Sequence, residues 1–335
     1  NDMAFFNLPD GKAFLVDADS GRMLAMLSTG YSFNAVIVPR SGGLIYAPET
    51  YYSRGTRGTR TDVVTLYDAA RLAPVGEIAI PPKRSSNMAM LANAALTDDE
   101  RFLLIYNFTP AQSVTVVDLR GRTLAGEVDT PGCALVYPTG ARTFFSICAD
   151  GSLLLTTLTD QGAAARQARS AVLFDAARDP LTEKGVRAGD TWLFASFEGT
   201  MYPLESTAGG ISLTATWPLF TPAELAAHWR TGAPQHLALH RASGQRYAIV
   251  HQGGTETHKD PGTAVWVYDV AAHRRVRQIA LHAKAGSIEV SQDARPLLYT
   301  AFIESSTLEV YDATSGKYLC SVTSIGQTPS VLVTP

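Results

Sequence analysis

The sequence predicts an all-β protein, and three observations lead to that prediction. Of its 335 residues, 46% are hydrophobic and 18% are charged, which supplies a core and excludes a disordered chain or a charged coiled coil. The 27 Gly and 18 Pro residues favour turns, while 13 Tyr and 13 Phe residues favour strands. The third observation is that one strand–turn–strand unit recurs along the chain.

The recurring unit is a strand that ends in Asp, followed by a turn and a second strand. The clear copies of its first strand are Phe14–Asp17, Val64–Asp68, Val114–Asp118, Val265–Asp269 and Leu308–Asp312. Neighbouring copies lie about 50 residues apart, and one interval is about three times longer. That interval holds two weaker copies, at Ser152–Leu158 and at Thr200–Leu204 with Ile211–Thr216. The unit therefore occurs seven times.

A hairpin of alternating character precedes the unit, which raises the number of strands in each copy to four. These hairpins are Ala35–Val38 with Leu44–Tyr46, Ala94–Leu96 with Phe102–Tyr106, Ala134–Tyr137 with Thr143–Ile147, His236–Leu239 with Tyr247–Val250, and Ile288–Val290 with Leu297–Tyr299. Four-stranded antiparallel sheets with this period are typical of a β-propeller. We expect one domain, residues 1–335, folded as a seven-bladed propeller.

The two ends of the chain complement each other in this scheme. Ser330–Thr334 has the pattern of a first strand without a continuation, and the first blade lacks its own first strand. A closed propeller leaves no sheet edge exposed, so we expect residues 330–334 to complete the first blade beside Met3–Phe6. Asn1 then falls inside a strand, and we expect the gene product to extend upstream of it.

Two local patterns have plain structural explanations. The Asp that ends each repeated strand is expected to accept backbone N–H groups of the following turn. Thr221 followed by Pro222 and Glu224 forms a capping box, which predicts a short helix over Thr221–Trp229.

Two of the three cysteines are placed to form a disulfide bond. Cys133 and Cys148 lie on the two strands of one hairpin, at equal distances from its turn at Pro138–Ala141. Directly opposed residues of paired strands are close enough for a disulfide. Such a bond would stabilise the fold by about 3 kcal/mol and would indicate an oxidising compartment. Cys320 is expected to be a buried thiol.

Charge and motif patterns exclude several functions. The 28 Lys and Arg residues do not exceed the 31 Asp and Glu residues, so nucleic acid is not an expected partner. No apolar run reaches the length of a membrane helix. The chain has no serine nucleophile elbow, phosphate-binding glycine loop or zinc-binding His-Glu-x-x-His helix. We therefore expect no catalytic residue in this chain.

Two polar loops are candidate sites. His251, Glu256 and His258 share one loop, but their spacing fits no pattern of metal ligands, and we expect no metal there. Arg54, Arg57 and Arg60 form a basic loop. An exposed loop between strands is the favoured interpretation, and contact with an acidic protein partner is the alternative. A propeller with these properties is most simply a scaffold.

Several segments resemble the heavy subunit of quinoprotein amine dehydrogenases. They are Tyr51–Val64, Ile80–Arg84, Cys148–Leu154, Leu239–Gly244, Thr257–Lys259 and Val290–Asp293. The similarity follows the same order from residue 1 to residue 335. Ile80–Arg84 and Gly253–Asp269 resemble the aromatic amine (aralkylamine) dehydrogenase heavy chain more than the methylamine dehydrogenase heavy chain.

The resemblance implies a subunit of a periplasmic α2β2 heterotetramer. In this family, tryptophan tryptophylquinone forms from two tryptophans of the small subunit and condenses with a primary amine. A small-subunit Asp removes the α-proton, aldehyde and ammonia leave, and electrons pass to a blue copper protein such as azurin or amicyanin. The resemblance thus places no cofactor in this chain, and the following residues are not its precursors: Trp192, Trp217, Trp229 and Trp266.

The resemblance also implies two features of this chain. A Phe in the first blade lines the substrate entrance of the family, and Asn1–Phe6 matches that stretch, so Phe6, or Phe5 in a shifted register, is the candidate gate. An aromatic side chain there would restrict substrate size and exclude water. The family's heavy-chain disulfide falls on Cys133 and Cys148, in agreement with the hairpin geometry.

Three other functions stay open at this point. The first is a methylamine dehydrogenase heavy subunit. The second is a lactonase-type propeller hydrolase, which requires acids and histidines, and usually a metal, gathered at the central pore. The third is a pure interaction propeller without a quinone-bearing partner.

Overall fold

The computed structural model describes residues 11–31, 36–86, 88, 90–207, 210–326 and 328–334. The chain divides into two compact units. The first comprises Asn1–Ala13 and Met26–Ala176, and the second comprises Phe14–Ala25 and Ala177–Pro335. The expectation of one domain stays a prediction.

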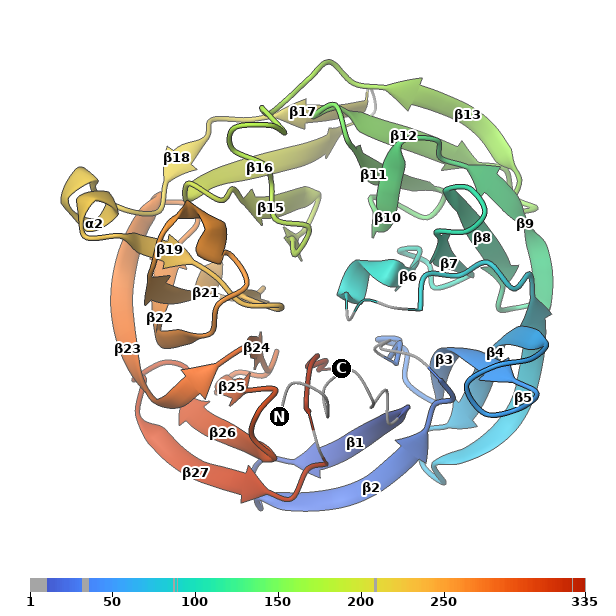
Figure 1. The fold of residues 1–335 in the computed structure, drawn as a ribbon, viewed down its shortest axis with the longest axis horizontal. Coiled ribbons are helices and arrows are strands. Elements are labelled where there is room, and N and C mark those ends of the chain that lie inside the picture. The colour runs from blue at the N-terminus through green and yellow to red at the C-terminus, as the bar shows by residue number, and fades with distance from the viewer. Residues whose placement is uncertain are drawn as a thin grey trace. The chain divides into compact units, whose positions relative to one another are not determined.

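Strands of the first unit form three antiparallel sheets in chain order (Figure 1). The strands are β3 (Leu44–Tyr52), β4 (Arg60–Asp68) and β5 (Ala73–Ile80); β6 (Ala94–Leu96), β7 (Phe102–Asn107), β8 (Ser113–Asp118) and β9 (Thr123–Asp129); and β10 (Cys133–Pro138), β11 (Thr143–Cys148), β12 (Leu153–Leu158) and β13 (Ala164–Arg169). A 3₁₀ turn, η1 (Leu91–Asn93), precedes β6. The predicted hairpins at 94–106 and 134–147 are confirmed.

Strands of the second unit form three further antiparallel sheets. The strands are β14 (Val186–Ala188), β15 (Thr191–Ala195), β16 (Thr200–Thr207), β17 (Gly210–Leu213) and β18 (Trp217–Pro218); β19 (Trp229–Thr231), β20 (Leu237–His240), β21 (Gln245–Gln252), β22 (Gly262–Asp269) and β23 (Arg274–Ala285); and β24 (Ser287–Val290), β25 (Leu297–Ala301), β26 (Thr307–Asp312) and β27 (Tyr318–Thr323). The short helices are α2 (Pro222–Ala226) and the 3₁₀ turn η2 (Thr255–Thr257). A seventh sheet pairs β1 (Lys12–Asp17) with β2 (Arg22–Ser28).

The all-β prediction is confirmed. The predicted four strands per sheet are found in some of the sheets. Among the described residues, three sheets have four strands, and two reach five by adding the short strands β18 and β19. The sheet β3–β5 has three strands because Ile37, in the predicted strand at 35–38, makes only one isolated bridge to Tyr46. Closure into a seven-bladed ring stays a prediction.

The core lies between sheets and follows the alternation of each central strand. In the first unit, Val64 and Leu66 of β4 pack with Leu103 and Ile105 of β7. In the second unit, strands β21, β22 and β25 contribute to a similar cluster. Outer strands such as β9 and β13 are largely exposed. This difference explains why the central strands carry the clearest signal in the sequence.

The repeated Asp residues have the structural role that the sequence predicts. In each case Oδ1 accepts an N–H group two or three residues further on, and the donors are Asp19 for Asp17, Ala70 and Arg71 for Asp68, Arg120 and Gly121 for Asp118, Ala272 for Asp269, and Ser315 for Asp312. The Ser315 N–H holds the pKa of Asp312 below its usual value. These carboxylates shape turns between β-strands.

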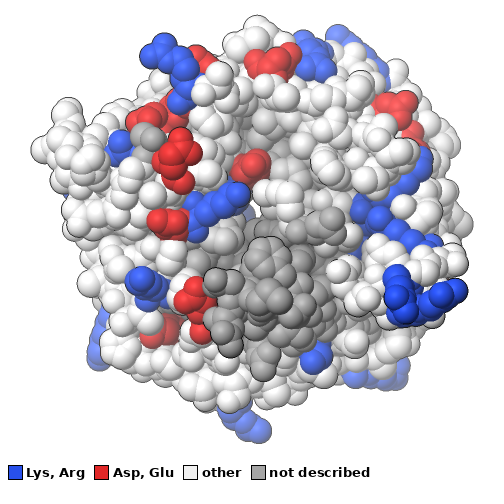
Figure 2. Space-filling view, in the orientation of Figure 1, with Lys and Arg blue, Asp and Glu red and all other residues white. Residues whose placement is uncertain are grey.

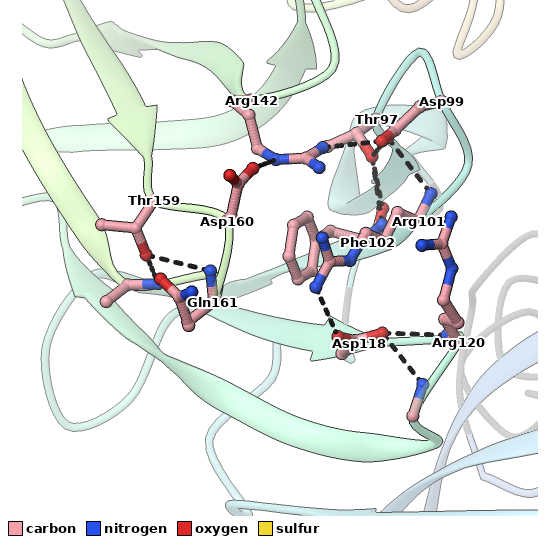
Figure 3. A network of polar contacts seen from close by, with 12 residues as sticks. Thr97, Asp99, Arg101, Phe102, Asp118, Arg120, Arg142, Thr159, Asp160 and Gln161 are labelled. Atoms are coloured by element: carbon pink, nitrogen blue, oxygen red, sulfur yellow. Dashed lines mark hydrogen bonds and ion pairs between the residues drawn. The ribbon is translucent and has the colours of Figure 1, made fainter.

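A polar network connects three turns within the first unit (Figure 3). Arg142, in the β10–β11 turn, forms ion pairs with Asp99 at 2.7 Å and with Asp160 at 3.0 Å. Its guanidinium lies 5.1 Å from the centre of the Phe102 ring, and that of Arg101 lies 4.9 Å from it. Adjacent sheets of this unit are therefore joined by charge as well as by apolar packing.

The predicted capping box is present, and the helix after it is shorter than expected. Thr221 Oγ1 accepts the Glu224 N–H at 3.3 Å, while Glu224 accepts the Thr221 N–H at 2.8 Å. The helix ends at Ala226 because His228 has a left-handed φ of 62° and Trp229 begins β19. Glu224 also pairs with Arg275 at 2.6 Å, which attaches α2 to β23.

The C-terminal segment differs from the prediction. Residues 330–334 form no strand. Side chains from other segments form hydrogen bonds with the backbone of this segment instead. Gln235 exchanges two hydrogen bonds with the backbone of Leu332, and Ser287 donates to the Ser330 carbonyl. The expected partner, Met3–Phe6, lies outside the described residues, so its pairing with this segment stays a prediction.

Candidate functional site

The hairpin β3–β4 extends beyond the sheet to which it belongs. Nine residue pairs join its strands without a bulge, from Leu44 opposite Asp68 to Tyr52 opposite Arg60. Strand β5 pairs with β4 only up to Asp62, which faces Ile80. Residues 51–60 therefore project past β5, and we call this segment the hairpin tip.

Backbone hydrogen bonds order the turn of the hairpin tip. The Ser53 N–H donates to the Thr59 carbonyl at 3.0 Å, and the Arg54 N–H donates to the Arg57 carbonyl at 2.9 Å. Gly58 has a φ of 99°, and a Cβ atom there would lie 2.4 Å from Ser53 Oγ. The turn therefore requires glycine at this position.

The exposed surface of the hairpin tip includes two arginines and a tyrosine. Arg54 and Arg57 are exposed, and no described carboxylate pairs with either of them. Tyr51 is 41% exposed. Tyr52 packs edge-on against Tyr31, with ring centres 5.7 Å apart. The tip thus presents positive charge beside aromatic surface.

A buried carboxylate anchors the base of the hairpin tip. Arg60 donates to both oxygens of Asp62, at 2.8 and 2.7 Å, and also to the Arg84 carbonyl at 2.8 Å. Asp62 is 1% exposed and accepts further bonds from the Thr50 hydroxyl and the Arg84 N–H. Its hydrogen bonds raise the pKa of Arg60. The third arginine of the basic loop is therefore structural.

Arg84 lies directly behind this anchor. Its side chain is 1% exposed, and its Nε and Nη2 atoms have no hydrogen-bond partner in the described structure. Burial lowers its pKa to about 10, although the nearby Asp62 carboxylate acts in the opposite direction. The Arg84 backbone forms a bridge to Asn107 at the end of β7. The anchor thus joins two sheets of the first unit.

A second buried carboxylate lies on β3 below the hairpin tip. Glu49 is fully buried and accepts hydrogen bonds from Tyr51 at 2.9 Å, from Tyr67 at 3.2 Å, and from Thr65. Burial raises the pKa of Glu49. Burial also raises the pKa of Tyr67 to about 12. Hydroxyl donors therefore compensate for the loss of water around this carboxylate.

Sequence reasoning identified the basic loop but missed Glu49, Asp62 and Arg84. A signal for the two acids is present, because each stands within a run of strand-forming residues, in Leu44–Tyr52 and Arg60–Asp68. Arg84 follows two prolines and a lysine, a context typical of an exposed loop. Its burial depends on the neighbouring sheet and has no local signal.

The predicted disulfide is present between Cys133 and Cys148, which face each other across β10 and β11. Cys320 is a free, half-buried thiol packed beside the β24–β27 core, whereas the sequence predicted a buried one. The candidate gate residues Phe6 and Phe5 lie outside the described residues, and their role stays a proposal.

The histidine loop of the second unit has ordinary packing contacts. His251 Nε2 is hydrogen-bonded to the Thr257 hydroxyl at 2.7 Å, and His258 stacks on Phe197 with ring centres 3.9 Å apart. Burial lowers the pKa of both histidines. In the part of the chain that the structure describes, no three side chains gather as metal ligands would.

Trp217, Trp229 and Trp266 pack against other aromatic rings. Trp229 and Trp266 lie 5.0 Å apart between ring centres, but Trp266 is 3% exposed and is covered by the Arg275 guanidinium at 3.9 Å. Trp217 is 4% exposed beneath His273. Trp266 and Trp217 are therefore shielded from solvent.

Solved structures with a similar fold include a β-propeller domain. The chain aligns with a β-propeller domain from Myceliophteria thermophila at a TM-score of 0.58 and 13% identity, covering 92% of this chain and 91% of that one. A functionally unknown protein from Desulfotomaculum acetoxidans gives 0.63 and 12%, with 95% of each chain covered. The dihydro-heme d1 dehydrogenase NirN gives 0.58 and 17%, with 94% of this chain and 61% of that one.

Sequence comparison defines the family. The profile of the methylamine dehydrogenase heavy chain (MADH) matches residues 1–335. The heavy chain from Methylophilus methylotrophus is 31% identical over 95% of this chain and 78% of its own length, and that from Paracoccus versutus is 32% identical over 96% and 75%. The chain belongs to the methylamine dehydrogenase heavy chain family. Its described helices include none that is long and apolar enough to cross a membrane.

Proposed function

We propose that this chain is the heavy subunit of a periplasmic quinoprotein amine dehydrogenase with two heavy and two small subunits. The observation that carries the proposal is the family match over residues 1–335, with heavy chains as relatives over nearly the whole chain. The disulfide between Cys133 and Cys148 supports an oxidising compartment such as the periplasm.

The proposed reaction converts a primary amine and water to an aldehyde and ammonia, with release of two electrons and two protons. The tryptophan tryptophylquinone of the small subunit supplies the electron sink for this chemistry. A blue copper protein such as azurin or amicyanin accepts the electrons one at a time. This chain holds the small subunit, and Phe6, or Phe5, narrows the entrance for the substrate.

The proposed substrate is an aromatic amine, and methylamine is the alternative. The aromatic preference rests on Ile80–Arg84 and Gly253–Asp269, the segments that resemble the aralkylamine enzymes. Ile80–Arg84 adjoins the hairpin anchor described above, since it ends at the buried Arg84. The matched relatives are methylamine enzymes, and this observation favours the alternative.

Purification of the native complex tests the proposal. We expect a small, cross-linked chain to co-purify, as measured by mass spectrometry, and to carry quinone absorbance in the visible range. Addition of phenylethylamine should bleach that absorbance, and methylamine in a parallel sample serves as the control for substrate class. Bleaching by methylamine alone would replace the aromatic assignment with the alternative.

A colourless chain without a partner would contradict the proposed function. Assays of the same sample for lactone hydrolysis, with and without divalent metal, then distinguish a hydrolase from a pure interaction propeller.

A further inference from the structure

The exposed arginines of the hairpin tip are not explained by the fold. Arg60, the third of the series, pairs with Asp62 and holds the hairpin in place. Arg54 and Arg57 contribute no ion pair to the described structure, although each is a long cation on an ordered turn. Two unpaired guanidinium groups at a projecting turn are available to carboxylates of another molecule.

Charge gathers around this element. Figure 2 shows Lys and Arg side chains clustered on the part of the visible face that lies over β4 and β5 in Figure 1. The whole chain carries a net charge of −3, so this local excess is not a property of the surface in general. A small cationic patch fits an acidic protein surface better than it fits the regular phosphates of nucleic acid.

The composition of the tip is that of a binding hot spot. Tyr51 and Tyr52 lie beside the arginines, and Tyr and Arg are the residues most often found to dominate binding energy at protein interfaces. The Tyr51 hydroxyl donates to the buried Glu49, so its ring is fixed while 41% of the residue stays exposed. The aromatic surface is thus presented in one orientation.

The tip is held in place before any partner arrives. The two hydrogen bonds from Arg60 to Asp62, the bond from Arg60 to the Arg84 carbonyl and the backbone hydrogen bonds within the turn restrict its conformation. A preorganised element loses little conformational entropy when it binds. This restriction gives a physical role to the buried anchor.

We propose that the hairpin tip, residues 51–60, is a docking element for the small subunit, and that Arg54 and Arg57 pair with carboxylates on that subunit. The proposal rests on the proposed function, which supplies the partner. A heavy chain has a light counterpart by definition, and the tip offers that counterpart charge and aromatic surface at once.

Charge reversal tests the proposal in the complete complex. Arg54→Glu with Arg57→Glu is compared with Arg120→Glu and Arg122→Glu, which makes the same change of charge in the exposed β8–β9 turn. Each heavy chain is co-expressed with the small subunit and washed at about 50 to about 500 mM NaCl. The fraction of small subunit retained and its dissociation constant are measured.

We expect the tip variant to bind the small subunit at least about tenfold more weakly and with a flatter salt dependence, while the control variant behaves as wild type. Arg54→Gln with Arg57→Gln, which removes the attraction without adding repulsion, should fall between them. Circular dichroism and urea midpoints confirm that all variants fold.

The outcomes separate the two proposals. Equal affinity and salt dependence for the tip variant and wild type overturn the docking role but leave the heavy-subunit function standing. If the wild-type chain retains no small subunit at any salt concentration, the proposed function fails first. Weakening by the control variant to the same degree shows a general charge effect and also overturns the docking role.

Discussion

Each unit of the molecule contains one fully buried arginine, and the two have different surroundings. Arg84, in the first unit, lies beside the buried carboxylate of Asp62 and behind the hairpin tip. Arg246, in the second unit, donates to the Met201 sulfur at 3.0 Å and lies 5.7 Å from the centre of the Tyr268 ring. No described carboxylate contacts Arg246.

The pKa values follow this difference. Burial lowers the pKa of Arg84 to about 10 and that of Arg246 to about 9. Only Arg84 has nearby carboxylates that oppose the effect of burial. Burial of a charge is costly unless a counter-charge compensates for it. The comparison therefore indicates that Arg84 belongs to an anchor, whereas Arg246 is held by the Met201 sulfur and the Tyr268 ring without a carboxylate.

The largest expected change in stability comes from removing Asp62, the carboxylate that contacts both Arg60 and Arg84 in the first unit. Asp62→Ala removes the carboxylate that most strongly favours the charged form of the buried Arg84, and it releases Arg60 at the base of the hairpin tip. We expect the free energy of unfolding to fall by about 3–5 kcal/mol, measured by urea denaturation. Asp62→Asn is the matched control, because it keeps the shape and an acceptor for Thr50. A loss below about 1 kcal/mol would show that Asp62 does not balance Arg84.

A smaller change in stability, of opposite sign, is expected at Arg246 in the second unit. Arg246→Met replaces an unpaired buried cation with an apolar side chain, and we expect a change from neutral to a stabilisation of about 1–4 kcal/mol. The matched variant Arg84→Met should gain less stability than Arg246→Met, because it also removes the favourable interaction of Arg84 with Asp62, which keeps its ion pair with Arg60. Urea midpoints of both variants check this order, and the reverse order would invalidate the distinction between the two arginines.

The smallest expected effect is a change in the pH dependence of stability, through Glu49. Its pKa in the folded chain lies above the ordinary value of 4.5, so the folded protein retains a proton that the unfolded chain has lost. Stability from this group is therefore complete below about pH 4.5 and declines as pH rises towards the raised pKa. Glu49→Gln should remove that decline, as measured by urea denaturation at several pH values. Parallel profiles for variant and wild type would show that Glu49 does not titrate in this way.

Local patterns predicted those parts of the fold that local chemistry determines. The strand-ending Asp68 and Asp118 shape their turns through bonds to residues two or three positions away, and such short-range bonds can be read from sequence. The disulfide was predictable because Cys133 and Cys148 are equidistant from one turn. The capping box at Thr221 is local for the same reason.

The features that were missed depend on neighbours distant in sequence. Residues 330–334 have the alternation of a strand, but their backbone is hydrogen-bonded to the side chains of Gln235 and Ser287 instead of to a neighbouring strand. Arg84 is buried by contact with another sheet, so no pattern around it signals its burial. The sequence therefore predicts only part of the candidate site. It indicates the exposed arginines but not the buried carboxylates.

The projecting hairpin also has a consequence for self-association. Strand β5 stops at the level of Asp62, so the outward edge of β4 at Arg60 and Thr61 has no strand beside it in the described structure. Open edges of this kind invite pairing with further copies of the same chain and lead to aggregation. Arg54 and Arg57 oppose this pairing, because two identical cationic turns repel each other. We expect this repulsion to limit pairing of separate copies through this edge.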